Sequence, residues 1–380
     1  MKKILFVVPS LNVGGTISAL MSIIEYLNSE YQIKVLALSH DGDSSKLSGN
    51  TLLSKSTLLN AYYCNYKNAK GFDKIIIAIF KVVKRLCRIL KIDLEKILSR
   101  TQSSSFKHYD TIVGFQEGEA TRFVSFIKSP NKIAWVHCDY RNYCSIPKER
   151  DIYEKFSTVV CVSKYTANSF STIYPSLQNR VVSVNNLLNL DLIIKSAELP
   201  VSDTLFNNDS FTIISVGRLD PVKRFEYIPR IAAELKSKGC KFIWYIIGPE
   251  VDNQCFSQLC AEIKSYSLER DVIYLGSKAN PYPYFKKADL LVSLSYTEAC
   301  PMIFNEAKVL KLPIVTTDFG SSYEFINNGE SGVIVGLKDI ADTLCSIISN
   351  SETYDTLKQN VCSQKYSNEN ILSQLRALFL

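Results

Sequence analysis

The 380-residue sequence lacks the features of several simple protein classes. Its 11 cysteines form no C-x-x-C pair and lie mostly within apolar runs, so we expect reduced, buried thiols in a cytoplasmic protein. No run of 18 apolar residues is present, which argues against a membrane-spanning helix. The apolar run after the first three residues is too short for a secretory signal, so we expect none.

Two common nucleotide-binding signatures are also missing. The chain has neither a G-x-G-x-x-G fingerprint nor a Walker A loop, which argues against a dinucleotide-binding enzyme and a P-loop nucleotidase. It contains no strict repeat and no low-complexity tract. With 46% apolar and 21% charged residues, it has the composition of a globular protein long enough for two domains.

Basic charge is concentrated in one part of the chain. Residues 51–100 hold 11 basic against 3 acidic side chains, whereas residues 201–380 hold 18 against 21. Within residues 74–100 the basic residues recur at helical spacing among aliphatic ones. This pattern predicts a basic amphipathic helix that lies on an anionic membrane surface. The alternative is a helix docked on its own sheet. Nucleic-acid binding fits poorly, because the basic patch carries many aliphatic residues.

Short apolar runs alternate with amphipathic stretches along the whole chain, which predicts parallel sheets with helical crossovers. We expect strands at residues 3–8, 32–38, 111–115, 132–136, 158–162 and 180–184, and a second series at 211–216, 241–247, 271–275, 290–294 and 313–317. Helices are expected between them, for example at 16–29 and 225–237. The polar segment 185–210 is interpreted as a linker.

The predicted fold class is therefore α/β, with two doubly wound Rossmann-like domains facing across a cleft. We place the first domain at residues 1–189 and the second at 190–365, with a C-terminal helix at about 366–380 packing back on the first. Ligands of such sheets bind at the carboxyl ends of the strands.

Three segments at predicted strand ends carry candidate chemistry. Gly14 and Gly15 follow the first strand and would let backbone N–H groups approach a phosphate, although a plain turn is an equal alternative. Arg218 and Lys223 share one loop after Gly217, a pairing that suits a diphosphate; a solvated loop is the alternative.

The third segment runs from Thr297 to Ala307. Glu298 is expected in a loop and Glu306 within a helix that has Pro301 in its first turn. Two carboxylates so placed suit the hydroxyl groups of a polyol. The alternative is a helix cap with an exposed glutamate.

Together these motifs resemble the retaining GT-B glycosyltransferases of family 4. The resemblance rests on Gly14-Gly15, Gly217-Arg218-Leu219 with Lys223, Ile246-Ile247-Gly248-Pro249, and the Glu-x7-Glu pair at Glu298 and Glu306, and it covers nearly the whole chain. The segment Trp135-Val136-His137-Cys138-Asp139 is similar to one found in polysaccharide-assembly members. Cys300 departs from the commonest pattern.

The resemblance implies a role for each matching residue. Arg218 and Lys223 would clamp the donor diphosphate, Glu306 would hold the ribose and Glu298 would lie near the transferred sugar. Gly14, Gly15, Gly217 and Gly248 would line the nucleotide site, the backbone of Cys300, Pro301, Met302 and Ile303 would contact sugar and phosphates, and His137 would lie near the donor sugar.

The expected reaction is sugar transfer, with retention, from a nucleotide sugar, with UDP favoured, to a glycan or lipid-linked acceptor of cell-surface polysaccharide assembly. The alternatives are a GT-B-like nucleotide-sugar epimerase and a non-catalytic subunit. Asp41-Gly42-Asp43 is similar to a D-x-D metal motif but is interpreted as a turn, so no metal is expected. The residues leave the donor sugar, the linkage, the oligomeric state and the route of retention open.

Overall fold

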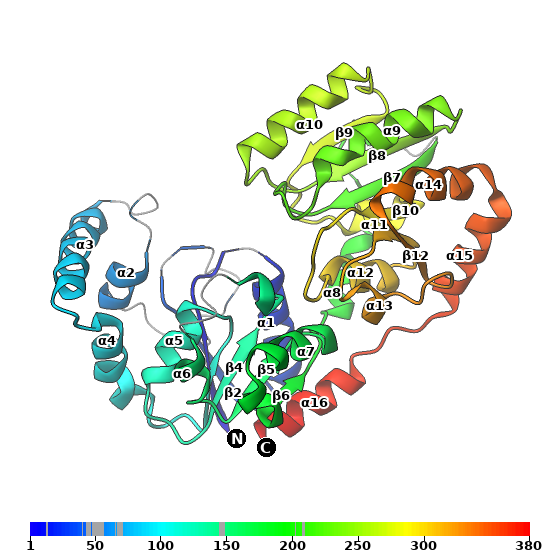
Figure 1. Ribbon diagram of the computed structural model, residues 1–380. Coiled ribbons are helices and arrows are strands. Elements are labelled where there is room, and N and C mark those ends of the chain that lie inside the picture. Colours follow the sequence, from blue (N-terminus) through cyan, green and yellow to red (C-terminus); the bar gives the residue numbers. More distant parts are fainter. Residues whose placement is uncertain are drawn as a thin grey trace. The chain divides into compact units, whose positions relative to one another are not determined.

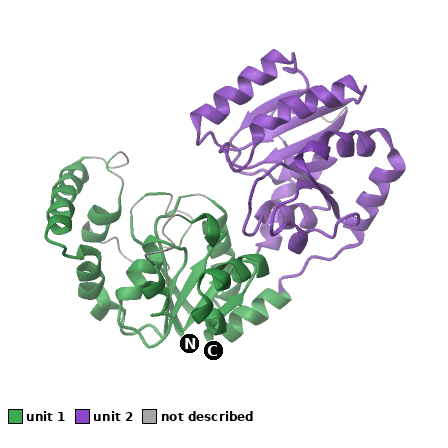
Figure 2. Ribbon diagram, viewed as in Figure 1, with its two compact units in different colours: residues 1–187, 369–380 green, residues 188–368 purple. Residues whose placement is uncertain are grey.

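The chain forms two compact units, each with its own parallel sheet. The structure is a computed structural model that describes residues 1–12, 14–39, 41–42, 47, 57–64, 66, 71–143, 149–201, 203–206 and 210–380. Unit 1 comprises residues 1–187 and 369–380, and unit 2 comprises residues 188–368 (Figure 2). The boundaries expected from the sequence lie within a few residues of these.

Unit 1 is built on a six-stranded sheet in the order β2-β1-β3-β4-β5-β6, with every described pairing parallel. Its strands are β1 (Lys3–Val8), β2 (Gln32–Ala37), β3 (Thr111–Gly114), β4 (Lys132–Val136), β5 (Thr158–Cys161) and β6 (Val181–Ser183). Its helices are α1 (Gly15–Leu27), α2 (Thr57–Tyr63), α3 (Phe72–Ile89), α4 (Leu94–Gln102), α5 (Glu119–Phe126), α6 (Arg150–Tyr153), α7 (Lys164–Ile173) and α16 (Glu369–Phe379) (Figure 1). The strand order reverses between β1 and β3, so this point is the switch point of the sheet.

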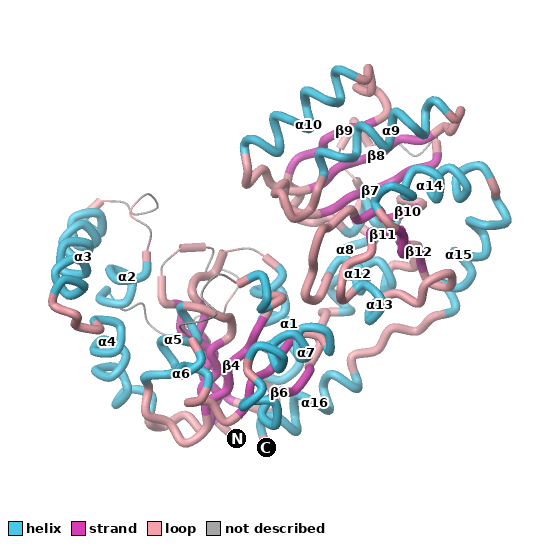
Figure 3. Tube along the Cα trace, viewed as in Figure 1, coloured by secondary structure: helices cyan, strands magenta, loops and turns pink. Residues whose placement is uncertain are grey.

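Unit 2 repeats this architecture with the order β12-β11-β10-β7-β8-β9 (Figure 3). Its strands are β7 (Phe211–Val216), β8 (Phe242–Ile247), β9 (Val272–Gly276), β10 (Leu290–Ser293), β11 (Ile314–Thr317) and β12 (Gly332–Val335). Its helices are α8 (Leu190–Ala197), α9 (Ile228–Ser237), α10 (Asn253–Ser265), α11 (Tyr282–Lys287), α12 (Met302–Val309), α13 (Ser322–Phe325), α14 (Ile340–Ser349) and α15 (Ser351–Ser363). Its switch point lies between β7 and β10. The two doubly wound units confirm the predicted fold class.

The central strands form because their side chains are buried on both faces, as is typical of parallel sheets, whereas the edge strand β6 is partly exposed. Five consecutive residues of β1, from Ile4 to Val8, are at most 1% exposed. In unit 1, Phe6 packs edge-on against Phe115, with ring centroids 5.4 Å apart, and against Phe379 of α16 at 6.0 Å. The aromatic contact and an Arg376–Glu30 ion pair of 2.8 Å fix α16 on unit 1.

The prediction of a linker over 185–210 is wrong for its central part. Helix α8 forms there because the Asn189 side chain accepts a hydrogen bond of 3.0 Å from the Leu192 N–H and caps the helix. Ile193 and Ala197 are buried. The polar flanks concealed this short amphipathic pattern.

The single helix predicted over 74–100 is also wrong, because two helices occupy this segment. Lys91, two residues after the end of α3, has a left-handed backbone with φ of 56°, which prevents the helix from continuing. The Asp93 carboxylate then accepts a 3.0 Å hydrogen bond from the Lys96 N–H and starts α4. Among the described residues, no helix combines the length and the apolar character needed to cross a membrane.

Candidate functional site

An ion pair lies at the switch point of unit 2. The Lys223 ammonium, on the loop after β7, contacts the Glu298 carboxylate on the loop after β10. Ser295 donates a 2.8 Å hydrogen bond to the same Glu298 oxygen. Both charged side chains are only 16% exposed. The structure therefore brings together two residues that the sequence placed 75 positions apart and assigned to one site.

Asp220 shapes the loop that carries Lys223. Its carboxylate accepts hydrogen bonds from the N–H groups of Val222, at 3.1 Å, and Lys223, at 3.2 Å. It also pairs with the Arg218 guanidinium at 3.1 Å, and the Arg218 side chain is 64% exposed. Arg218 and Lys223 thus share a loop but pair with different carboxylates, so the convergence expected of the two cations is not present in this structure.

Two glycines allow the loops after β7 and β8 to meet. A Cβ atom on Gly248 would lie 1.7 Å from the Gly217 carbonyl oxygen, a distance that no side chain can tolerate. A Cβ atom on Gly217 would lie 3.2 Å from Cε of Lys223. Gly217 and Gly248 therefore leave room for the lysine to lie along the loop.

The start of α12 lies close in sequence to Glu298. Pro301 is the N-cap residue rather than part of the first helical turn, which corrects the expected boundary by one residue. Its ring fixes φ near −70° but leaves ψ extended at 96°, so the helix begins at Met302. No side chain caps this end, which leaves backbone N–H groups of Met302 and Ile303 available to an anion. The Ser321 hydroxyl anchors the loop by donating a 2.7 Å hydrogen bond to the Glu298 carbonyl.

Glu306 is a second carboxylate in unit 2 with a different environment. It lies in α12, and the Tyr282 hydroxyl of α11 donates a 3.3 Å hydrogen bond to it. Burial raises the pKa of Glu306 to about 7. A carboxyl group with this pKa changes its charge near neutral pH. A hydroxyl group donates a stronger hydrogen bond to the ionised form than to the protonated one.

A second polar site lies at the switch point of unit 1. The loops after β1 and β3 border a pocket of about 420 Å³. It is lined by Pro9, Gln116, Glu117, Gly118, Glu119, Arg122, Tyr143 and Glu149. Burial is the main cause that raises the pKa values of Glu117, Glu119 and Glu149. Tyr140 donates a 2.7 Å hydrogen bond to Glu149.

His137 lies beside this pocket at the end of β4. Its backbone N–H donates a 2.8 Å hydrogen bond to Glu117 Oε2, and its ring contacts Phe115 at a centroid distance of 4.7 Å. Burial lowers the pKa of His137 to about 3, so the imidazole is neutral at physiological pH. Its Nε2 atom is buried and has no hydrogen-bond partner in the described part of the chain. Because buried polar atoms usually have a partner, this atom is a candidate for a further hydrogen bond.

Sequence reasoning missed Glu117. The residue follows a predicted strand, but so do many polar residues, and only the strand order shows that this loop flanks a switch point. The hydrogen bond to the His137 N–H adds a second reason to assign Glu117 to the site.

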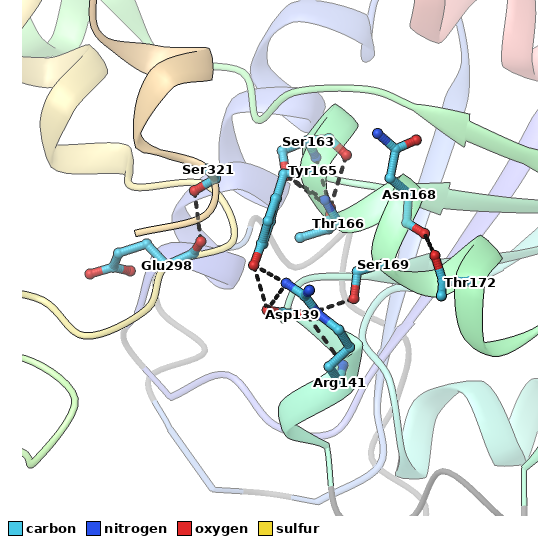
Figure 4. Close-up of polar contacts among 10 residues, drawn as sticks. All are labelled: Asp139, Arg141, Ser163, Tyr165, Thr166, Asn168, Ser169, Thr172, Glu298 and Ser321. Carbon is cyan, nitrogen blue, oxygen red and sulfur yellow. Dashed lines mark hydrogen bonds and ion pairs between the residues drawn. The ribbon is translucent and has the colours of Figure 1, made fainter. Parts of the chain in front are cut away.

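Asp139 organises the loop that follows His137 (Figure 4). Its carboxylate pairs with Arg141 at 2.9 Å and accepts hydrogen bonds from Ser169 at 2.6 Å and Tyr165 at 3.2 Å. Ser169 and Tyr165 both belong to α7, so Asp139 ties the loop after β4 to this helix. The Trp-Val-His-x-Asp segment therefore contributes His137, which bonds the pocket-lining Glu117, and Asp139, which ties the following loop to α7.

The remaining predicted residues lie on neighbouring loops of unit 1. Gly14 is the N-cap of α1, without a side-chain cap, and a Cβ atom there would meet nothing within 4 Å. Its small size is thus not required by packing against the described residues. Gly42 has φ of 97°, and a Cβ atom on it would lie 2.1 Å from the Leu11 backbone, so a glycine is required at this turn. Asp43 and His40 lie outside the described residues.

Asp41 has local partners. Its carboxylate accepts a 3.3 Å hydrogen bond from the Ser39 hydroxyl and lies 3.7 Å from the Cys64 thiol. Within the described ranges, no cluster of three or more His, Cys, Asp or Glu side chains is arranged to hold a metal ion.

Residues 201–363 match the sequence family described as Glycosyl transferases group 1. An uncharacterized glycosyltransferase of Methanocaldococcus jannaschii is 23% identical over 248 residues, which cover 63% of this chain and 60% of the relative. The N-acetylgalactosamine-N,N'-diacetylbacillosaminyl-diphospho-undecaprenol 4-alpha-N-acetylgalactosaminyltransferase of Campylobacter jejuni is 25% identical over 253 residues, covering 66% of this chain and 65% of the relative. The chain thus matches less than two thirds of the length of these relatives.

The fold agrees over a longer range. The structure of HepE from Anabaena, solved in complex with UDP and glucose, superposes with a TM-score of 0.72 and 17% identity and covers 99% of both chains. The chain therefore has the GT-B fold, and the residues that match the Glycosyl transferases group 1 family lie within its second unit.

Proposed function

We propose that the protein is a retaining glycosyltransferase that moves a sugar from a nucleotide diphosphate sugar, of the UDP type, to a lipid-linked glycan of cell-surface polysaccharide assembly. The observation that carries this proposal is the Lys223–Glu298 pair at the switch point of the unit that matches the glycosyltransferase family. The name of the Campylobacter relative, which includes a diphospho-undecaprenol acceptor, supports the choice of a lipid-linked acceptor.

Unit 2 would bind the donor through opposite charge. On binding, the diphosphate would replace Glu298 as the partner of Lys223, and Arg218 and the free N–H groups of α12 would add to its neutralisation. Glu298 would then be released to accept hydrogen bonds from hydroxyl groups of the transferred sugar. Ionised Glu306 would accept hydrogen bonds from the ribose. Because these cations supply the positive charge, we propose that transfer requires no metal ion.

Unit 1 would bind the acceptor through hydroxyl groups. Glu117, Glu119 and Glu149 offer hydrogen-bond acceptor oxygens around the pocket. Neutral His137 would bond a hydroxyl of the donor sugar, the role that the sequence resemblance implies. In the reaction, the bond between the anomeric carbon and the phosphate oxygen breaks while a bond to the acceptor oxygen forms. The acceptor proton passes to the leaving phosphate. Lys223 stabilises the charge that develops on that phosphate, which is the largest contribution expected of the site.

Helix α3 would hold the enzyme on the membrane. One face of it is apolar and exposed, and its members recur at helical spacing: Phe72, Ile75, Ile79, Val82, Leu86, Ile89 and Leu90. Only Ile77 of this helix is buried, which disfavours the alternative of a helix buried in the core. Lys84 turns inward to the Tyr62 carbonyl, whereas Arg85 and Arg88 are exposed. The Arg85→Gln/Arg88→Gln variant should therefore bind anionic vesicles more weakly than the wild type.

The test begins with thermal unfolding in the presence of UDP-, GDP- and ADP-sugars. A UDP-sugar should raise the melting temperature, and the purified enzyme should then transfer its sugar to a polyprenyl-diphosphate-linked acceptor. NMR of the product should show the same anomeric configuration as the donor. Failure of all three nucleotide classes to stabilise the protein, or an inverted product, would refute the proposal.

A further inference from the structure

A second pocket of unit 1, with a volume of about 700 Å³, has no role in the proposed reaction. Among its described lining residues there is no carboxylate but five cationic side chains: Lys96, Arg100, Lys128, Lys132 and Lys155. The other lining residues are Ser125, Phe126, Ile127, Ser129 and Pro130. We call this cavity the basic pocket.

The basic pocket lies at the amino-terminal edge of the sheet of unit 1. Lys132 is the first residue of β4, residues 128–130 lead into that strand, and Lys155 precedes β5. His137 follows the other end of β4. The pocket is thus separated from the carboxyl-edge site by the length of a strand, and it is a different site from the one that holds Glu117.

The cations of the basic pocket repel one another. Burial lowers the pKa of Lys132, and Lys155 lowers it further. The pKa of Lys155 is lowered by burial first and then by Lys96, with a smaller effect of Arg100, while Asp151 and Asp93 oppose the shift.

The chain holds these cations mainly without carboxylates. Lys132 donates to the carbonyls of Ser125, at 3.1 Å, and Ile127, at 3.2 Å. Lys155 lies over the Phe126 ring, 4.6 Å from its centroid. A cluster of like charges that the protein neutralises only in part attracts a polyanion. Lysines in particular suit the compact charge of a phosphate group.

Exposed apolar residues lie on the chain segment that contributes Lys96 and Arg100 to the basic pocket. Ile97 lies next to Lys96 on α4 and is 47% exposed, and Ile92, in the turn between α3 and α4, is 43% exposed. This turn continues directly from the apolar face of α3, and Figure 1 shows the two helices in succession along one side of unit 1. Cationic groups beside exposed aliphatic side chains match the boundary between phosphate headgroups and acyl chains.

We propose that the basic pocket binds the phosphate headgroup of an anionic membrane lipid. The inference deepens the membrane contact proposed for α3 and rests on it. It assigns the headgroup contact to residues outside α3, so the two contacts can be separated by mutation. The phosphate-binding chemistry would also serve a free phosphate compound, and the experiment distinguishes these sources.

The test measures co-sedimentation with vesicles of phosphatidylglycerol and of phosphatidylcholine. In the triple variant Lys96→Gln/Lys128→Gln/Lys155→Gln, affinity for phosphatidylglycerol vesicles should fall on the order of 100-fold. The matched control Lys241→Gln/Lys264→Gln/Lys338→Gln removes the same charge from exposed positions of unit 2 and should bind like the wild type. Neither variant should bind phosphatidylcholine vesicles. Unchanged binding of the triple variant to phosphatidylglycerol would overturn the inference.

Inorganic pyrophosphate distinguishes a soluble ligand from a lipid. If, with UDP saturating unit 2, pyrophosphate stabilises the wild type but not the triple variant, and vesicles do not bind, the basic pocket serves a free phosphate compound and the lipid assignment is wrong. UDP affinity and transfer to a soluble acceptor should be the same in the triple variant and the wild type. If the proposed function is wrong, the wild type will not transfer sugar to any acceptor, and this result does not depend on the outcome of the vesicle experiment.

Discussion

The switch points of the two units have the same topology but opposite chemistry. In unit 2, a lysine and a glutamate from neighbouring loops neutralise each other. In unit 1, the corresponding loops bring together carboxylates whose pKa values are raised by burial, beside a neutral histidine. In unit 2, a phosphate could replace Glu298 as the partner of Lys223. In unit 1, the carboxylates can accept hydrogen bonds from hydroxyl groups but would repel an anion. Under the proposed function, one fold used twice divides donor and acceptor recognition between its two copies.

The largest effect is expected for the cation of unit 2. Lys223→Ala should lower the rate of transfer by at least about 100-fold, because the departing diphosphate loses a charged partner. The fold should survive, since Lys223 lies on a loop. The matched control is Lys286→Ala, which breaks an exposed pair with Glu198 in the same unit and should keep full activity. If Lys223→Ala transfers sugar as fast as Lys286→Ala, the assignment of the diphosphate to Lys223 in unit 2 is wrong.

The corresponding change in unit 1 should affect the acceptor. Glu117→Gln keeps an oxygen for the His137 N–H but removes the carboxylate from the pocket. We expect kcat/KM for the acceptor to fall about 10-fold, because hydrogen bonds to a charged acceptor are the stronger ones. Glu154→Gln, at an exposed site of the same unit, provides the control. Equal kinetics of the two variants would show that the pocket does not bind the acceptor.

Glu306 should make the free energy of unfolding depend on pH. Its pKa is about 7 in the folded protein, above the usual value of 4.5, because it is buried. The protonated form is therefore favoured by folding, and the free energy of unfolding should decrease as the pH rises from 4.5 to 7. The decrease is at most about 3 kcal/mol and should be absent in Glu306→Gln. Urea unfolding at pH 5 and pH 8 measures it; identical pH profiles of the two proteins would contradict the assignment.

The same group predicts how nucleotide affinity depends on pH. Ribose hydroxyls donate best to an ionised carboxylate, so UDP affinity should increase through pH 7 in the wild type more than in Glu306→Gln. The variant serves as the control for ionisation of UDP itself. A difference between the two proteins that stays constant from pH 6 to pH 8 would show that Glu306 does not titrate in the nucleotide site.

The smallest effect is expected from chelation. Incubation with EDTA should leave the transfer rate unchanged, because Lys223 and Arg218 supply the charge that a metal would provide. A rate that falls with EDTA and returns with Mg²⁺ or Mn²⁺ would contradict this and would direct attention to Asp41 and Asp43.

Local sequence pattern predicted much of this molecule because parallel strands are buried on both faces. The strands β1, β4 and β7 begin and end where the apolar runs do, and Lys223 and Glu298 meet as their positions at strand ends implied. Strand order is set by packing between distant segments, so the sequence could not show that Glu117 flanks a switch point. The end of α3 depends on the backbone conformation of one residue, Lys91, and the start of α8 depends on one side-chain hydrogen bond of Asn189. The basic pocket joins residues from three separate segments, which no local pattern can show.

Calorimetric titration of UDP into three proteins tests the division between the units most directly. Relative to the wild type, Lys223→Ala should bind UDP at least about 10-fold more weakly, because it loses a charge-assisted contact with the diphosphate. Glu117→Gln should bind UDP within about twofold of the wild type, because it lies in the unit assigned to the acceptor. Unchanged affinity in Lys223→Ala, or an equal loss in Glu117→Gln, would contradict the account.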